Sequence, residues 1–170
     1  GRNVTAYFGN GKYANKTATG VFYITKVATP MNITVINSDI KVGDTVQIVV
    51  SLPSDIIGES VTIEINGKKY PGTTDGNGNA TFSVPLITYG NKTVTAIYGG
   101  DYKYVSNSTT ANFTVTKRNS YVNVTVQNIT VGGVADIEVR VPANATSYVV
   151  VVVDGVNYTA NLTGGIGHVH

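Results

Sequence analysis

The chain has 170 residues, of which only 13% are charged, and its formal net charge of +2 includes no basic run. This pattern argues against a nucleic-acid-binding protein or a polybasic lipid-binding segment, because both depend on clustered lysine and arginine. Cysteine is absent, so disulfide bonds do not hold the fold together. The longest apolar run, Tyr148–Val153, is much shorter than the roughly 20 residues of a membrane helix, so no membrane insertion is expected.

The first predicted element, within residues 1–26, is a pair of strands with one apolar face. The side chains of that face are Val4, Tyr7 or Phe8, Phe22 and Ile24. A two-stranded hairpin is at best marginally stable in water. We therefore expect something else to cover this face.

Residues 28–117 show the most regular alternation of apolar and polar side chains, which predicts half-buried strands. The predicted strands are 31–37, 44–52, 60–65, 68–70, 79–85, 92–98 and 110–117. Asn66 and Gly67 predict a two-residue hairpin turn, because both residue types tolerate a positive φ. Short strands at this spacing predict an antiparallel β-sandwich of the immunoglobulin type. Its core is expected to consist of valine, isoleucine, phenylalanine and tyrosine, since the Cys…Trp…Cys signature is absent.

The last segment begins like a further sandwich but has no closing strands. Val149, Val151 and Val153 share one strand face, and Asp154–Gly155 predicts a second two-residue turn. A sandwich without its closing strands leaves an open groove and unpaired sheet edges.

Internal repeats account for both incomplete segments. Val4–Gly9 aligns with Val94–Gly99, so the first segment copies the end of the complete module. Ile129–Pro142 aligns with Ile40–Pro53, so the last segment copies its beginning. The predicted fold class is all-β, with tandem immunoglobulin-like β-sandwiches. It comprises one complete module over 28–117 and two partial modules over 1–26 and 121–170.

The residues of the complete module resemble a known repeat. Tyr98–Lys117, with Gly-Asp, spaced tyrosines and an FTV strand, is similar to the closing strands of bacterial-type Ig-like repeats of cell-surface adhesins. It is especially similar to repeats of adhesin-like proteins of methanogenic archaea, and Ile40–Pro53 and Thr73–Pro85 resemble earlier strands of the repeat. The first copy departs from this pattern, because Gly9–Tyr13 offers no equivalent of Asp101. The resemblance implies tandem extracellular display on a cell surface, with some modules acting only as spacers.

Asn-x-Ser/Thr sequons are frequent and predict a glycoprotein, because a bulky polar glycan needs a solvent-facing asparagine. The candidate acceptors are Asn15, Asn32, Asn79, Asn91, Asn107, Asn123, Asn144 and Asn157. The alternative is that strands rich in threonine and asparagine generate the tripeptide by chance.

Two short patterns are weak candidates for metal binding. Asp75 begins a loop, Asp75–Asn79, with oxygen-bearing side chains at alternate positions, but the bidentate glutamate of a calcium loop is missing. His168 and His170 lie on one face of a predicted strand, but two ligands are too few for a structural zinc site. We therefore expect no metal and no cofactor.

The sequence does not predict an enzyme, because it contains no Ser/His/Asp set, no pocketed carboxylate pair and no phosphate-binding glycine loop. The favoured hypothesis is a non-catalytic module that extends an adhesin stalk. The alternative is a module that binds carbohydrate or protein, with surface glycans or proteins of other cells as partners. Tyr98, Tyr102 and Tyr104 are candidates for stacking on sugar rings, although one of them is expected to pack as a tyrosine corner.

The two partial modules also predict a partner of the same kind as the chain itself. The strands of residues 1–26 of one chain are expected to fill the groove of residues 121–170 of another by strand addition. Repeated head to tail, this contact gives an open row of molecules, and repeated reciprocally it gives a swapped dimer.

Overall fold

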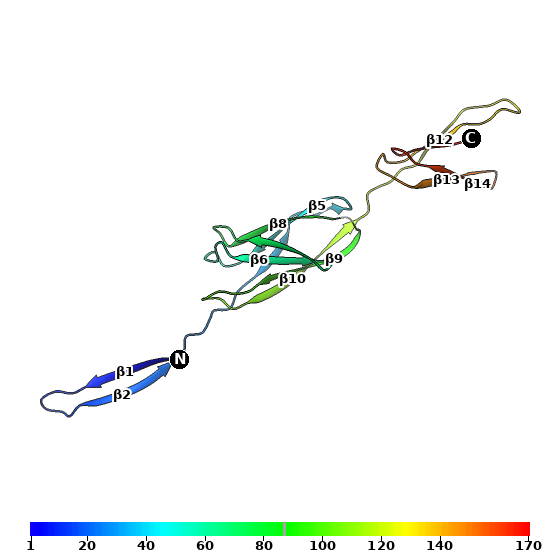
Figure 1. The fold of residues 1–170 in the computed structure, drawn as a ribbon. Coiled ribbons are helices and arrows are strands. Elements are labelled where there is room, and N and C mark those ends of the chain that lie inside the picture. The colour runs from blue at the N-terminus through cyan, green and yellow to red at the C-terminus, as the bar shows by residue number, and fades with distance from the viewer. Residues whose placement is uncertain (87) are drawn as a thin grey trace. The chain divides into compact units, whose positions relative to one another are not determined.

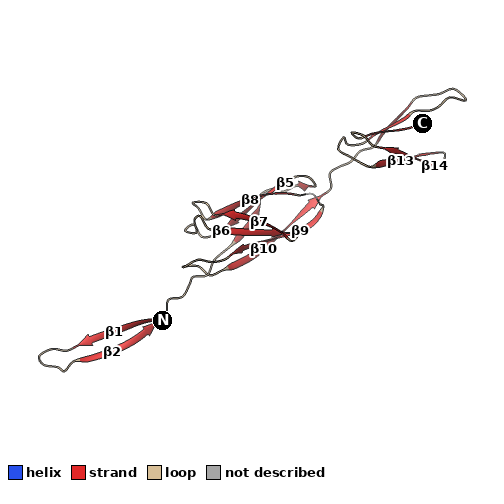
Figure 2. Cartoon of the chain, viewed as in Figure 1, coloured by secondary structure: helices blue, strands red, loops and turns tan. Residues whose placement is uncertain are grey.

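The computed structural model describes residues 1–86 and 88–170, and all of their regular structure is β-strand (Figures 1 and 2). Over these residues there is no helix with the length and hydropathy needed to cross a membrane. The chain divides into two compact units, Gly1–Lys117 and Arg118–His170. The predicted all-β fold class is confirmed.

The first unit begins with a hairpin of two seven-residue strands, β1 (Arg2–Phe8) and β2 (Lys16–Phe22). The strands are antiparallel, with Arg2 opposite Phe22 and Phe8 opposite Lys16. Every residue of both strands is exposed. The hairpin therefore has backbone pairing but no core of its own.

The rest of this unit is an immunoglobulin-like sandwich of two sheets. One sheet has the order β3 (Asn32–Val35), β5 (Thr45–Ser51), β8 (Asn79–Pro85). The other has the order β4 (Ile40–Lys41), β10 (Asn107–Thr116), β9 (Gly90–Tyr98), β6 (Ser60–Ile65), β7 (Lys68–Thr73). Alternate side chains of both sheets point inward and are buried, among them Ile48, Val50, Ile63 and Val94. This burial matches the period-two pattern of the sequence.

Three features of the sandwich differ from the sequence-based strands, the first being that β10 begins at Asn107 and not at residue 110. The two-residue strand β4 was not expected, and it exists because Ile40 pairs in parallel with Val115 of β10. β7 continues through Pro71 to Thr73. Proline is tolerated there because β7 is the edge strand and pairs only with β6.

Both predicted two-residue turns are confirmed. Asn66 and Gly67 have φ values of 52° and 75°, and Asp154 and Gly155 have values of 48° and 83°. Positive φ at both central positions is the geometry that matches the right-handed twist of the flanking strands.

The second unit repeats part of the sandwich. Its three-stranded sheet has the order β11 (Asn123–Val126), β12 (Ile137–Arg140), β15 (Ile166–Val169). Its second sheet consists of β13 (Tyr148–Val153) and β14 (Val156–Asn161). These sheets correspond to β3-β5-β8 and to β6-β7. Within residues 118–170, all of which are described, no strand corresponds to β9 or β10. The chain thus contains one complete sandwich flanked by two partial modules.

Candidate functional site

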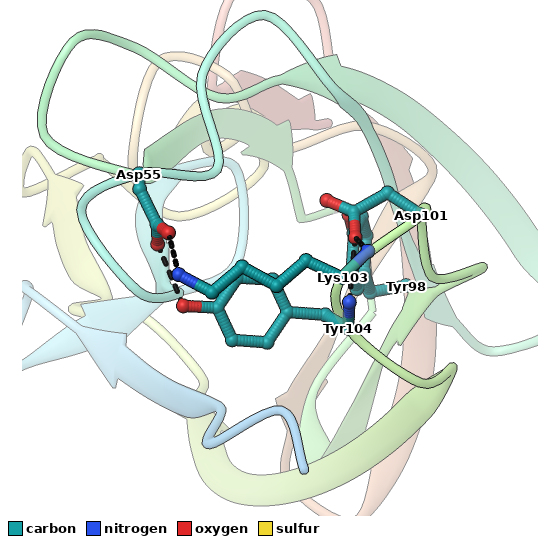
Figure 3. Close-up of polar contacts among 5 residues, drawn as sticks. All are labelled: Asp55, Tyr98, Asp101, Lys103 and Tyr104. Atoms are coloured by element: carbon teal, nitrogen blue, oxygen red, sulfur yellow. Dashed lines mark hydrogen bonds and ion pairs between the residues drawn. The ribbon is translucent and has the colours of Figure 1, made fainter. Parts of the chain in front are cut away.

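A group of polar contacts in the sandwich lies where the turn between β9 and β10 meets the loop between β5 and β6 (Figure 3). We call it the Asp55 cluster, and it consists of Asp55, Tyr98, Asp101, Lys103 and Tyr104. Four of these residues belong to the stretch that carries the family resemblance. Asp55 was not singled out by sequence analysis.

Asp101 shapes the turn from within. Its Oδ1 accepts hydrogen bonds from the backbone N–H groups of Lys103 (2.8 Å) and Tyr104 (2.6 Å). Its own N–H donates to the carbonyl of Tyr104 at 3.0 Å. Hydrogen bonds from backbone N–H groups favour the ionised carboxylate, so the pKa of Asp101 lies below its usual value, with the Tyr104 N–H the largest cause.

Asp55 joins this turn to the opposite loop. Its carboxylate accepts one hydrogen bond from Lys103 Nζ at 2.6 Å and another from the Tyr104 hydroxyl at 2.7 Å. The Lys103 contact, followed by the Tyr104 contact, lowers the pKa of Asp55. The same hydrogen bonds raise the pKa values of Lys103 and Tyr104. Lys103 Nζ also lies 5.0 Å from the centre of the Tyr104 ring, within cation–π range.

Tyr98 connects the cluster to the core. Its side chain is only 2% exposed, and its hydroxyl donates to Asp101 Oδ2 at 3.0 Å. Burial, followed by the hydrogen bond to Asp101, raises the pKa of Tyr98 to about 12. The phenol therefore stays neutral and keeps donating its proton at physiological pH.

The chemistry of the cluster is structural. Each ionised group faces an oppositely charged or hydrogen-bonding neighbour, and this arrangement fixes a loop to a turn. Tyr98 and Tyr104 are buried and their hydroxyls are hydrogen-bonded, so neither ring is open to stack on a sugar. For these two tyrosines the expectation of sugar stacking is wrong. Tyr102 is 92% exposed.

The hairpin β1–β2 contains a counterpart of this turn. Asn10 Oδ1 accepts from the N–H groups of Lys12 (2.8 Å) and Tyr13 (2.9 Å), and the Asn10 N–H donates to the Tyr13 carbonyl at 3.2 Å. These bonds repeat those of Asp101, so the statement that Asp101 has no equivalent in the first copy is wrong. The match was hidden because the first turn is one residue shorter than Gly99–Tyr104.

The segment that enters the sandwich runs beside the turn between β9 and β10. Val27 pairs in parallel with Tyr104, donating its N–H to the Lys103 carbonyl at 2.8 Å. Thr29 Oγ1 donates to the Val105 carbonyl, and Asn107 Nδ2 donates to the Thr29 carbonyl at 2.7 Å.

The same parallel arrangement recurs near the end of the exit strand. β4 pairs with β10, and the Val42 N–H donates to the Thr116 carbonyl at 2.9 Å. The entry segment is therefore bonded to the β9–β10 turn and to the start of β10, whereas β4 and Val42 are bonded to the end of β10.

The weak metal candidates contact other groups of the chain. Asp75 is occupied as a turn acceptor, because its Oδ1 receives the N–H groups of Asn77 and Asn79, which lower its pKa. His168 Nδ1 lies 3.0 Å from Asp136 Oδ1, and His170 Nδ1 lies 3.5 Å from the same oxygen. Among the described residues, no group of three or more His, Cys, Asp or Glu side chains is arranged to hold a metal ion.

The candidate glycan acceptors lie mainly on outward strand faces and in turns. The exposed ones are Asn15, Asn32, Asn91, Asn107, Asn123, Asn144 and Asn157. Asn79 is half-buried at the start of β8. The Asn107 amide nitrogen is already hydrogen-bonded to Thr29, so that acceptor is engaged by the protein itself.

One protein-family model matches most of the complete sandwich. Residues 33–116 match the model of the family described as bacterial Ig-like domain (group 3). No curated protein matches the sequence significantly. One solved structure, described as a Ca2+-stabilized adhesin that helps an Antarctic bacterium reach out and bind ice, is 20% identical with a TM-score of 0.42. The alignment covers 98% of this chain and 48% of the other, so this chain spans about half the length of that structure.

Proposed function

We propose that this chain is a non-catalytic spacer of an extracellular, surface-displayed repeat protein. In this role its sandwich extends a stalk that carries adhesive parts of the protein towards surface glycans or proteins of other cells. The match to a bacterial Ig-like domain and the resemblance of Tyr98–Lys117 to archaeal adhesin-like repeats support this role.

The observation that carries the proposal is the parallel pairing of the early strand β4 with the last strand of the sandwich, β10. Ile40 and Lys41 of β4 lie beside Val115 and Thr116 of β10 and run in the same direction. A force on the two ends of the chain pulls β4 and β10 past each other along their length. Because this force acts along the strands, the hydrogen bonds between them share the load. A force perpendicular to the strands would break the same bonds one after another. A stalk under tension needs this kind of resistance.

The exposed aromatic side chains of the sandwich favour a spacer over a binding module. A binding site for sugar or protein needs a contiguous exposed patch. Tyr89 and Tyr102 are 62% and 92% exposed, but they lie beyond opposite ends of the nine-residue strand β9. Single exposed tyrosines at this separation need no binding role.

Outward-facing sequons support display outside the cell. Asn32 on the edge strand β3 and Asn91 on the central strand β9 are both exposed, so a glycan at either position would meet solvent. Bound glycans there would also hinder lateral association of neighbouring stalks.

Single-molecule pulling of the full chain between its ends tests the spacer role. We expect unfolding of the sandwich to release about 300 Å of chain, the extended length of residues 28–117. Val42→Pro removes the N–H that bonds to Thr116, and it should lower the unfolding force. The control is Ile48→Val, which changes the core away from the paired strands β4 and β10. The lowering of the unfolding force is compared for equal losses of equilibrium stability. If it is the same in both variants, the pairing of β4 with β10 bears no special load and the proposal is wrong.

A further inference from the structure

Two sequons of the complete sandwich lie opposite each other on neighbouring strands. The first, Asn91–Thr93, belongs to β9, and the second, Asn112–Thr114, belongs to β10. We call them the β9 sequon and the β10 sequon. The two strands are antiparallel, and their register places the asparagine of each sequon opposite the threonine of the other. β9 lies between β6 and β10, and β10 lies between β4 and β9, so both sequons belong to the interior of a sheet.

The side chains of the two sequons are hydrogen-bonded to each other in both directions. Thr93 Oγ1 donates to Asn112 Oδ1 at 2.8 Å. Thr114 Oγ1 donates to Asn91 Oδ1, also at 2.8 Å. All four residues are exposed, so these bonds form on the outward face of the sheet. In the folded sandwich each threonine hydroxyl is therefore engaged by the asparagine of the other sequon.

The middle residue of each sequon is buried on the opposite face of the same sheet. Lys92 and Phe113 lie opposite each other and are 7% and 9% exposed. Lys92 Nζ donates to Thr88 Oγ1 at 2.6 Å, and Phe113 belongs to the hydrophobic core. A sequon can therefore leave its strand only if one of these side chains is withdrawn from the interior of the sandwich.

Glycan transfer to a sequon needs the groups that this arrangement engages. The asparagine Nδ2 attacks the anomeric carbon of a lipid-linked oligosaccharide. A carbon–nitrogen bond forms, the bond from that carbon to the lipid phosphate breaks, and the amide gives up one proton as the lipid phosphate leaves. Because only serine or threonine serves at the third position, the transferase must contact that hydroxyl together with the asparagine. Amide resonance makes the nitrogen a weak nucleophile, so the asparagine side chain must also be free to turn.

We propose that the β9 and β10 sequons are glycan acceptors that close when the sandwich folds. An oligosaccharyl transferase uses them while the chain is unfolded, because their hydroxyls and asparagines are then free. Once β9 and β10 pair, the same hydroxyls are engaged and the middle residues are buried. Neither hydrogen bond uses an amide nitrogen, and both asparagines are exposed. A chain that received glycans before folding can therefore still form both bonds.

A sequon in a turn provides the comparison within the same chain. Asn144 is exposed in the turn between β12 and β13, and the third residue of its sequon, Thr146, is also exposed and lies outside the strands. This sequon stays open after folding. The proposal deepens the proposed function and rests on it for the extracellular setting in which glycans are displayed. It adds that the glycans of the β9–β10 face are fixed before the sandwich folds.

Glycosylation of the purified full chain in vitro tests the proposal. The chain is produced in a host that does not glycosylate it and is treated with a lipid-linked oligosaccharide. The enzyme is a purified oligosaccharyl transferase that requires only Asn-x-Ser/Thr, and mass spectrometry of peptides gives the rate at each asparagine. The second sample is Ile63→Asp, which places a carboxylate in the core and should unfold the sandwich. Circular dichroism verifies the folded and unfolded states.

The two samples should differ at the strand sequons alone. In the folded chain we expect Asn91 and Asn112 to react at least about 10³ times more slowly than in Ile63→Asp, because only the unfolded fraction of a stable domain reacts. Asn144 belongs to the other compact unit and should react at the same rate in both samples. Reaction of Asn91 or Asn112 in the folded chain at the rate of Asn144 overturns the closure. Absence of reaction at both asparagines in Ile63→Asp overturns their role as acceptors.

A milder core variant separates closure by folding from slow reaction for other reasons. Ile48→Val leaves the sandwich folded but raises its unfolded fraction, which urea unfolding measures. The rates at Asn91 and Asn112 should rise together by the same factor as the unfolded fraction, whereas the rate at Asn144 should not change. Rates at Asn91 and Asn112 that do not follow the unfolded fraction overturn the proposal. These measurements do not involve the unfolding force, so the closing sequons and the spacer role fail separately.

Discussion

The Tyr104 hydroxyl lies 2.7 Å from the Asp55 carboxylate and donates a hydrogen bond to it across 49 positions of sequence. Together with the contact between Lys103 and Asp55, this bond ties the turn between β9 and β10 to the loop between β5 and β6. Because Val27 pairs with Tyr104 in the same turn, the bond also supports the segment that enters the sandwich. Its removal should therefore affect the stability of the sandwich rather than a single side chain.

Tyr104→Phe should lower the urea midpoint of the full chain, because the Asp55 carboxylate loses one of its two side-chain donors. Tyr102→Phe removes a hydroxyl from a side chain that is 92% exposed in the same turn, and it should leave the midpoint unchanged. Equal midpoints for the two variants would contradict the role given to the Asp55 cluster.

Alkaline pH should destabilise the sandwich through Tyr98. Its folded pKa of about 12 lies above the value of about 10 expected in the unfolded chain. The neutral phenol is therefore favoured by folding, and this contribution is complete below pH 10 and is lost as the pH rises towards 12. Tyrosinate absorbance should show a late transition that Tyr98→Phe removes. At neutral pH the same variant should cost about 1 kcal/mol, because Asp101 loses a donor. Persistence of the late transition in the variant would assign it to another tyrosine.

Acid should destabilise the sandwich for the opposite reason. The pKa values of Asp55, Asp75 and Asp101 are lowered in the folded chain by their hydrogen-bond donors. These groups stabilise the fold above about pH 4, and the stabilisation is lost as the pH falls through their folded pKa values. The free energy of unfolding, measured in urea from pH 6 downwards, should fall most steeply below pH 4. Asp55→Asn should flatten this fall, and an unchanged slope would show that Asp55 does not contribute to it.

Much of this fold could be predicted because its strands and turns are specified by local sequence patterns. Val61, Ile63 and Ile65 alternate with polar residues. This pattern predicts a strand with the same bounds as the observed β6. Asn66–Gly67 predicts its turn from residue type alone.

β4 could not be predicted from the local sequence, because it depends on pairing with a distant strand. Ile40–Gly43 and Ile129–Gly132 are almost the same sequence, yet only the first contains a strand, because only there does β10 pair with it. The Asp55 cluster could not be assembled from the sequence for a similar reason. Asp55 lies in a loop without periodicity, and its partners Lys103 and Tyr104 are 48 and 49 residues away. The role of Asn10 was missed because its turn is one residue shorter than the later one and has asparagine in place of aspartate, whereas its hydrogen bonds identify it with Asp101.

Gly78 should be intolerant of any side chain, and the same loop contains a matched control. Gly78 has a φ of 79°, and a Cβ there would lie 2.3 Å from the Pro53 carbonyl oxygen. The Leu52 N–H donates to the Gly78 carbonyl at 3.0 Å, so the loop cannot move away without breaking this bond. Gly78→Ala should therefore destabilise the sandwich by at least about 1–3 kcal/mol, the usual cost of a strained backbone position. Gly76→Ala adds a Cβ that meets no atom within 4 Å and should change the stability by less than about 0.5 kcal/mol. Urea unfolding of both variants measures the difference, and similar values would show that the backbone at Gly78 relaxes at little cost.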